Sequence, residues 1–92
     1  MAEIIKANYG HEIVEPINGT DFSLEELRDI VGGHIEVLTD LTGENYMVLN
    51  EEGKIEGLPY NVFATMIARK HFGIGNDVIV GDVLICKVNQ IL

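Results

Sequence analysis

The sequence holds 92 residues, with 15 acidic and 6 basic side chains and a formal net charge of −9. Apolar residues make up 47% and charged residues 23%, which is typical of a folded globular domain and not of a disordered chain. Direct binding of a nucleic-acid backbone needs clustered lysines and arginines, so the charge argues against that class of protein. We expect one folded domain over residues 1–92 that does not bind nucleic acid directly.

Location and cofactor chemistry are restricted by what the sequence lacks. No basic segment followed by a long apolar run stands at the N-terminus, and no apolar stretch reaches the ~20 residues of a membrane span. We therefore expect a cytoplasmic protein without membrane contact. Cys86 is the only cysteine, and His11, His34 and His71 are not spaced for a metal site on one element. Neither a metal nor another cofactor is expected.

The first half of the chain shows two hairpin patterns around a short helix. Residues 3–8 and 12–15 have strand propensity around an Asn-Tyr-Gly turn. Ser23 and Glu26 have the spacing of a capping box, which predicts a helix of about eight residues that ends at a Gly-Gly pair. Residues 34–40 and 44–50 predict a second hairpin.

The second half combines short strands with a longer helix. Residues 54–56 indicate a third short extended segment after a turn, and residues 60–72 have a helical pattern whose apolar face is Val62, Phe63, Met66 and Ile67. Residues 77–88, broken at a Gly-Asp pair, hold the most apolar strand, which belongs in the middle of a sheet. Together these elements predict an α+β fold, a mainly antiparallel sheet covered on one face by two helices, with a ferredoxin-like sandwich as the alternative.

The candidate binding residues lie on the second helix and beside it. Asn61, Thr65 and Arg69 recur at every fourth position, on the side opposite the expected apolar face. Their amide, hydroxyl and guanidinium groups suit a phosphate or carboxylate, and Tyr60 can stack on a base. Further candidates are Asn50 and Lys54. We call Asn61, Thr65 and Arg69 the stripe. An ordinary amphipathic helix with a polar outer face, capped by Asn61, explains the stripe without any ligand.

The sequence resembles a family of small uncharacterised proteins, a domain of unknown function common in bacteriophages and bacterial mobile elements. The resemblance runs from about residue 24 to 88 and is carried by an ordered series of short motifs. These are Gly-x-Ile-Glu from Gly33, Asn-Glu-Glu-Gly-Lys from Asn50, Leu-Pro-x-Asn from Leu58 and Gly-Asp at Gly81. It implies a phage setting and interference with host machinery, but no catalytic residue.

Two hypotheses of function follow, and both are non-enzymatic. The first is a counter-defence protein that sequesters a small anionic, nucleotide-like ligand at a homo-oligomer interface, using the stripe on the second helix. The second is an acidic imitation of DNA that occupies a nucleic-acid-binding host protein, because residues 1–60 hold 13 of the acidic side chains and only three bases. No catalytic group is expected, since Ser23, the only serine, serves as a helix cap.

Overall fold

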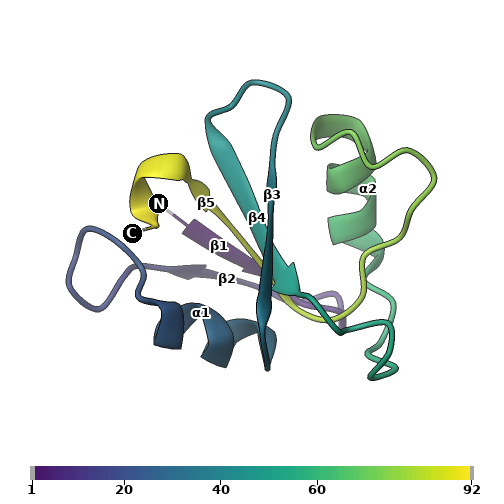
Figure 1. The fold of residues 1–92 in the computed structure, drawn as a ribbon, viewed down its shortest axis with the longest axis horizontal. Helices are drawn as coiled ribbons and strands as arrows, with labels where there is room; N and C mark the ends of the chain where they lie inside the picture. The colour runs from purple at the N-terminus through teal and green to yellow at the C-terminus, as the bar shows by residue number, and fades with distance from the viewer. Residues whose placement is uncertain (1, 92) are drawn as a thin grey trace.

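The computed structural model describes residues 2–91. Five strands form one antiparallel sheet in the order β2-β1-β5-β4-β3 (Figure 1). The strands are β1 (Ala2–Ile5), β2 (His11–Val14), β3 (Ile35–Thr39), β4 (Asn45–Asn50) and β5 (Val83–Lys87). The helices are α1 (Leu24–Val31) and α2 (Val62–His71), and a short 3-10 turn, η1 (Val88–Gln90), follows β5. The predicted α+β class and antiparallel sheet are confirmed.

Both hairpins and the first helix form where the sequence predicts them. Ser23 accepts a hydrogen bond from the Glu26 amide, and the Glu26 carboxylate accepts one from the Ser23 amide, so the capping box is complete. Gly32 ends α1 in the left-handed conformation, with φ of 81°. The most apolar strand, β5, lies in the centre of the sheet between β1 and β4.

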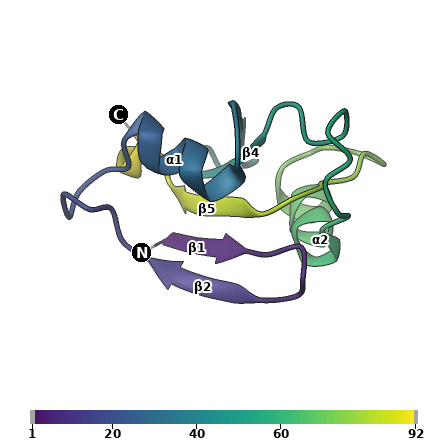
Figure 2. The ribbon, with the colours of Figure 1, turned by 90° about the horizontal axis from the view of Figure 1, so that it is seen from below.

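The two helices lie on opposite faces of the sheet, which corrects the expectation that they share one (Figures 1 and 2). Successive side chains of a strand point to opposite faces, and both faces of the central strands are apolar. On β4, Val48 packs with Leu27 and Val31 of α1, whereas Met47 packs with Ala64 and Ala68 of α2. The fold is therefore not the ferredoxin-like sandwich named as the alternative.

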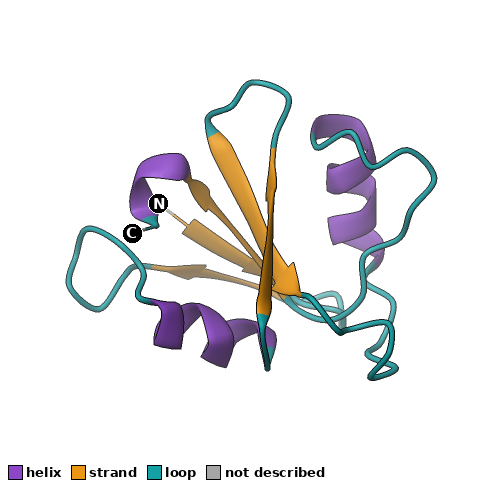
Figure 3. Cartoon of the chain, viewed as in Figure 1, coloured by secondary structure: helices purple, strands orange, loops and turns teal. Residues whose placement is uncertain are grey.

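Two predicted extended segments are not strands. Residues 54–56 form part of a continuous turn from 51 to 57, in which the Glu56 amide donates to the Glu52 carbonyl. Residues 77–80 form an irregular loop with a single bridge from Val80 to Tyr60. Figure 3 shows both segments as loops beside α2. They pair with no strand of residues 2–91, so their backbone groups need other partners.

Candidate functional site

The second helix is rotated relative to the sequence prediction. Ala64, Thr65 and Ala68 are buried, whereas Phe63 and Met66 are 47% and 61% exposed. The sequence prediction placed Val62, Phe63, Met66 and Ile67 on the buried face of this helix. For Phe63 and Met66 that prediction is wrong. Small side chains face the sheet instead, which lets the helix backbone approach the strands closely.

Asn61 is wholly buried at the start of α2 and caps it. Its Oδ1 accepts from the Ala64 amide at 3.1 Å. Its Nδ2 donates to two main-chain carbonyls, those of Ile5 at 3.0 Å and Gly81 at 2.8 Å. The amide group is thus fully used inside the chain, and the expectation of an outward-facing Asn61 is wrong.

Thr65 is the next residue of the stripe and is also buried, with 1% of its surface exposed. Its hydroxyl accepts from the Ile79 amide at 2.9 Å and donates to the Ile79 carbonyl at 3.3 Å. It therefore pairs with both main-chain groups of one loop residue, and the prediction that it lies on the outer face is wrong. The physical reason is that this loop has no strand partner among residues 2–91, and a hydroxyl supplies both a donor and an acceptor.

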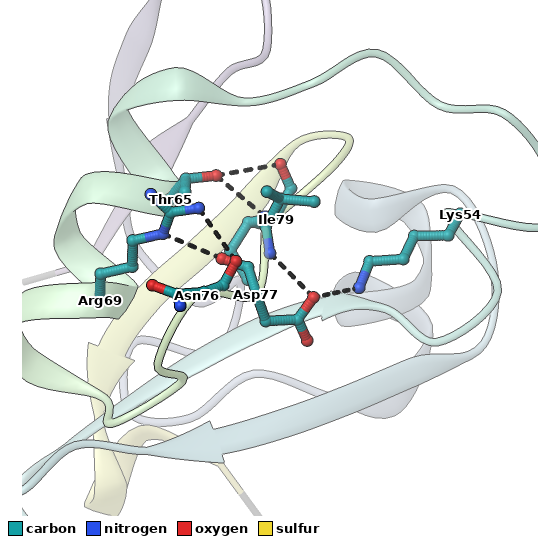
Figure 4. Close-up of polar contacts among 7 residues, drawn as sticks. Lys54, Thr65, Arg69, Asn76, Asp77 and Ile79 are labelled. Atoms are coloured by element: carbon teal, nitrogen blue, oxygen red, sulfur yellow. Dashed lines mark hydrogen bonds and ion pairs between the residues drawn. The ribbon is translucent and has the colours of Figure 1, made fainter.

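Arg69 completes the stripe and is exposed, but its guanidinium binds the same loop (Figure 4). Nε donates to the Asp77 carbonyl at 3.0 Å and Nη2 donates to the Asn76 carbonyl at 3.1 Å. The stripe therefore holds the loop at 76–81 through main-chain groups of Asn76, Asp77, Ile79 and Gly81. The structure brings Asn61, Thr65 and Arg69 together as predicted, but around an internal segment.

Of the remaining candidates, Lys54 and Tyr60 contact that same loop, whereas Asn50 is bonded to α1 and to the turn at 51–57. Lys54 forms an ion pair with Asp77, and both side chains are more than half exposed. The Lys54 hydrogen bond lowers the pKa of Asp77, helped by the Val78 amide. Asn50 is buried at the end of β4, where its Nδ2 donates to the Val31 carbonyl and to Glu56. Tyr60 is 48% exposed and pairs with Val80 through its main chain.

A hollow of about 160 Å³ opens between β3, β4, the turn at 51–57 and the loop at 74–80. Its apolar wall includes Leu38, Leu49 and Ile74. Its charged lining consists of three carboxylates and one ammonium group, those of Glu36, Glu51, Asp77 and Lys54. Because Lys54 is paired with Asp77, an excess of two negative charges remains beside the hollow.

Of the residues that line this hollow, sequence reasoning named Asn50 and Lys54 as binding candidates, but not Glu36, Glu51 or Asp77. A signal for Glu36 was present, since it is the one charged residue in β3, an otherwise uncharged strand that becomes a sheet edge. Within residues 2–91, no three His, Cys, Asp or Glu side chains come close enough to hold a metal ion. No helix described here is long and apolar enough to cross a membrane.

The fold and hollow define a small α+β domain whose central sheet has a helix on each face and a lined cavity at one edge. The chain belongs to a family described as a domain of unknown function, DUF3846, whose model matches residues 2–90. No curated protein and no solved structure matches the chain.

Proposed function

We propose that this chain is a non-catalytic binding protein that takes an extended, basic segment of a partner protein along the free edge of β3. The observation that carries this proposal is the hollow beside that edge, where carboxylates outnumber the single lysine. An extended segment that joins a sheet edge gains affinity from main-chain hydrogen bonds and specificity from pockets for alternate side chains. Here the edge of β3 supplies the main-chain hydrogen bonds, and the hollow supplies the side-chain pocket.

The edge of β3 presents unpaired main-chain groups. His34 and Asp40, which flank the strand, bond through their main chains to Glu51 and Asn45 of the β4 side. Hydrogen-bonded pairs alternate along an antiparallel ladder, so Glu36 and Leu38 also bond to β4. The N–H and C=O groups of Ile35, Val37 and Thr39 therefore point away from β4, where no described strand pairs with them.

The hollow fits one long basic side chain. Its volume of about 160 Å³ is close to that of an engineered cavity that holds one benzene molecule, roughly 150 Å³. The alkyl stem of a lysine or arginine can lie against Leu38 and Ile74, while its charged end reaches Glu36 or Glu51. A nucleotide needs a larger pocket, on the order of 300 Å³ or more.

The internal use of the stripe favours a basic partner over an anionic ligand. Asn61 and Thr65 have their polar groups satisfied within the chain. Lys54 is bound to Asp77, and Arg69 is bound to two carbonyls. An anion would have to displace these bonds and approach the excess carboxylates. Of the two sequence-based hypotheses, the occupation of a basic host protein is therefore the better supported.

In the phage setting that the family resemblance implies, such binding would be a counter-defence activity. A basic segment of a host nucleic-acid-binding protein would be held on β3 and kept from its nucleic acid. The net charge of −9 would speed the encounter with such a partner.

The test uses an extended peptide of about eight residues in which lysine and valine alternate, with a twin that carries glutamate in place of lysine. Fluorescence anisotropy should show saturable binding of the lysine peptide alone, weakened by added salt because screening acts on exposed charges. Removing both charges with Glu36→Gln and Glu51→Gln should weaken binding about fivefold. Equal binding of the two peptides would contradict the proposal.

Two control variants separate this site from general attraction to an acidic protein. Glu25→Gln with Asp29→Asn removes the same charge from exposed positions of α1, and binding should change less than twofold. Val37→Pro removes an amide that points away from β4, so the hairpin should persist while peptide binding falls at least tenfold. Full binding by Val37→Pro would rule out pairing with the edge of β3.

A further inference from the structure

The outward side of α2 carries large apolar side chains that the core leaves largely exposed. Phe63 and Met66 are about half exposed, and Ile67 beside them is partly buried. These positions lie three and four residues apart, so they form one continuous surface along the helix. The helix is attached to the sheet by its opposite, small-residue face. Ile67 packs partly against the core, whereas Phe63 and Met66 stay outward.

The first hairpin extends this surface. The ring of Tyr9 packs edge-on against the ring of Phe63, with 5.8 Å between their centroids, and Tyr9 is 65% exposed. Tyr9 has a φ of +73°, a conformation that costs a bulky residue roughly 1–2 kcal/mol. A shallow depression of about 390 Å³ lies between the hairpin and the helix, with Ile5 and Ile67 in its lining.

Charge distinguishes this surface from the rest of the molecule. α2 contains Arg69, Lys70 and no acidic residue. In the hairpin, Glu3 is the carboxylate that lines the depression, and it contacts His11 at 2.9 Å. The Lys6–Glu12 pair lies on the other face of the hairpin, with Ile4. The surface is therefore close to neutral, although the chain carries −9. Two copies of so acidic a chain repel one another through most other faces, and this face lets them approach.

We propose that the α2–hairpin surface, formed by Tyr9, Phe63, Met66 and Ile67, is the contact of a two-fold symmetric homodimer. The occupant is a second copy of this chain. In an antiparallel arrangement of the two α2 helices, the outward Lys70 of one copy approaches Glu3 of the other hairpin. The four side chains expose about 400 Å² of apolar surface, the scale at which a patch on a monomer is often functional. Rim residues then bring the contact toward the ~800 Å² per partner of a stable interface.

This inference is independent of binding at β3, because the two surfaces share no residue. Val37→Pro should leave the dimer intact, and the loss of the dimer should leave the edge of β3 free to bind the lysine peptide. Failure of either proposal is thus recognisable without reference to the other.

Sedimentation equilibrium of the full chain, over roughly 1–500 μM, tests the dimer. The wild type should approach twice the chain mass of 10.2 kDa as concentration rises. Met66→Lys places like charges across the two-fold axis and should raise the dissociation constant at least tenfold. Ile17→Lys changes an 88%-exposed residue outside the surface and should behave as the wild type.

Tyr9→Asn tests the same contact from the hairpin, because asparagine tolerates positive φ. It should also weaken the dimer at least tenfold, with an unchanged circular dichroism spectrum. A wild type that stays at 10.2 kDa throughout would overturn the proposal. So would variants Met66→Lys and Tyr9→Asn that dimerise as well as Ile17→Lys.

Discussion

Asn61 joins three parts of the chain through one side chain. It caps α2, and its Nδ2 group holds the end of β1 through Ile5 and the turn before β5 through Gly81. An amide is well suited to this position, because it donates two hydrogen bonds and accepts one at a site without solvent. The side chain expected to meet a ligand is thus a structural centre of the domain.

Asn61→Ala should therefore lower the free energy of unfolding by about 2–4 kcal/mol. The change removes a helix cap and leaves two buried carbonyls and an amide without partners. Urea denaturation checks this value against Asn76→Ala, which removes an exposed side chain while keeping the carbonyl that Arg69 uses. We expect the Asn76 variant to change stability by less than 0.5 kcal/mol or so. Equal effects of the two changes would contradict the role given to Asn61.

Alanine substitutions at Gly81 and Gly19 distinguish the cost of backbone strain from the cost of steric crowding. Both glycines have positive φ, 76° and 82°, but only a Cβ at Gly81 would meet another residue, the Leu58 side chain at 2.8 Å. Gly19→Ala should cost roughly 1–2 kcal/mol from conformation alone. Gly81→Ala should cost about 1 kcal/mol more, because Leu58 has to move. Thermal unfolding of both variants measures the difference, and a smaller loss for Gly81→Ala would refute the crowding.

At the scale of elements, local signals predicted the first half of the chain well. The capping box of Ser23 and Glu26 and the glycine that ends α1 are short-range features, and both form as predicted. The central place of β5 followed from its continuous apolar sequence. These features depend on neighbours in the chain, so no tertiary knowledge was needed.

The face of α2 could not be predicted in the same way. Two sets of residues recur at helical spacing: the large Phe63 and Met66, and the small Ala64 and Ala68. Hydrophobicity favours the larger pair, but the loop at 76–81 needs hydrogen-bond partners that Asn61 and Thr65 supply. The sequence signal for this face was the irregular, glycine-containing loop itself. Its hydrogen-bond partners are not near neighbours in the chain, since Ile79 and Thr65 are 14 residues apart.

The hairpin turn between β3 and β4 predicts a pH dependence. Asp40 accepts hydrogen bonds from the Asn45 side chain, from Thr42 and from the Asn45 and Glu44 amides, which together lower the pKa of this carboxyl well below its usual value. Because the folded-state pKa is depressed, the carboxylate stabilises the fold above pH ~4, and this stabilisation is lost as the pH falls toward the folded-state pKa.

Asp40→Asn should therefore reduce the loss of stability between pH 7 and pH 3. Urea midpoints at the two pH values measure this loss in wild type and variant. Glu44→Gln removes a charge from the same turn, but its side chain makes none of these contacts, so its loss should match the wild type. If Asp40→Asn lost as much stability between pH 7 and pH 3 as the wild type does, this carboxylate would not contribute to the acid sensitivity.

At the scale of the molecule, the two proposals assign different surfaces different tasks. The edge of β3 and its hollow carry excess carboxylates, and the outward face of α2 with Tyr9 is nearly neutral and apolar. The sequence indicated the acidic excess and the possibility of a homo-oligomer. It could not indicate which acids meet, since Glu36, Glu51 and Asp77 are brought together only by tertiary folding.

A titration of ¹⁵N-labelled protein with the alternating lysine–valine peptide tests the central claim most directly, because NMR amide shifts locate the bound segment. We expect saturable shifts concentrated at Ile35, Val37 and Thr39 and around the hollow, with the amides of Phe63 and Met66 unaffected. Shifts spread over α1 and the other acidic surfaces, or confined to α2, would contradict a binding site at the edge of β3.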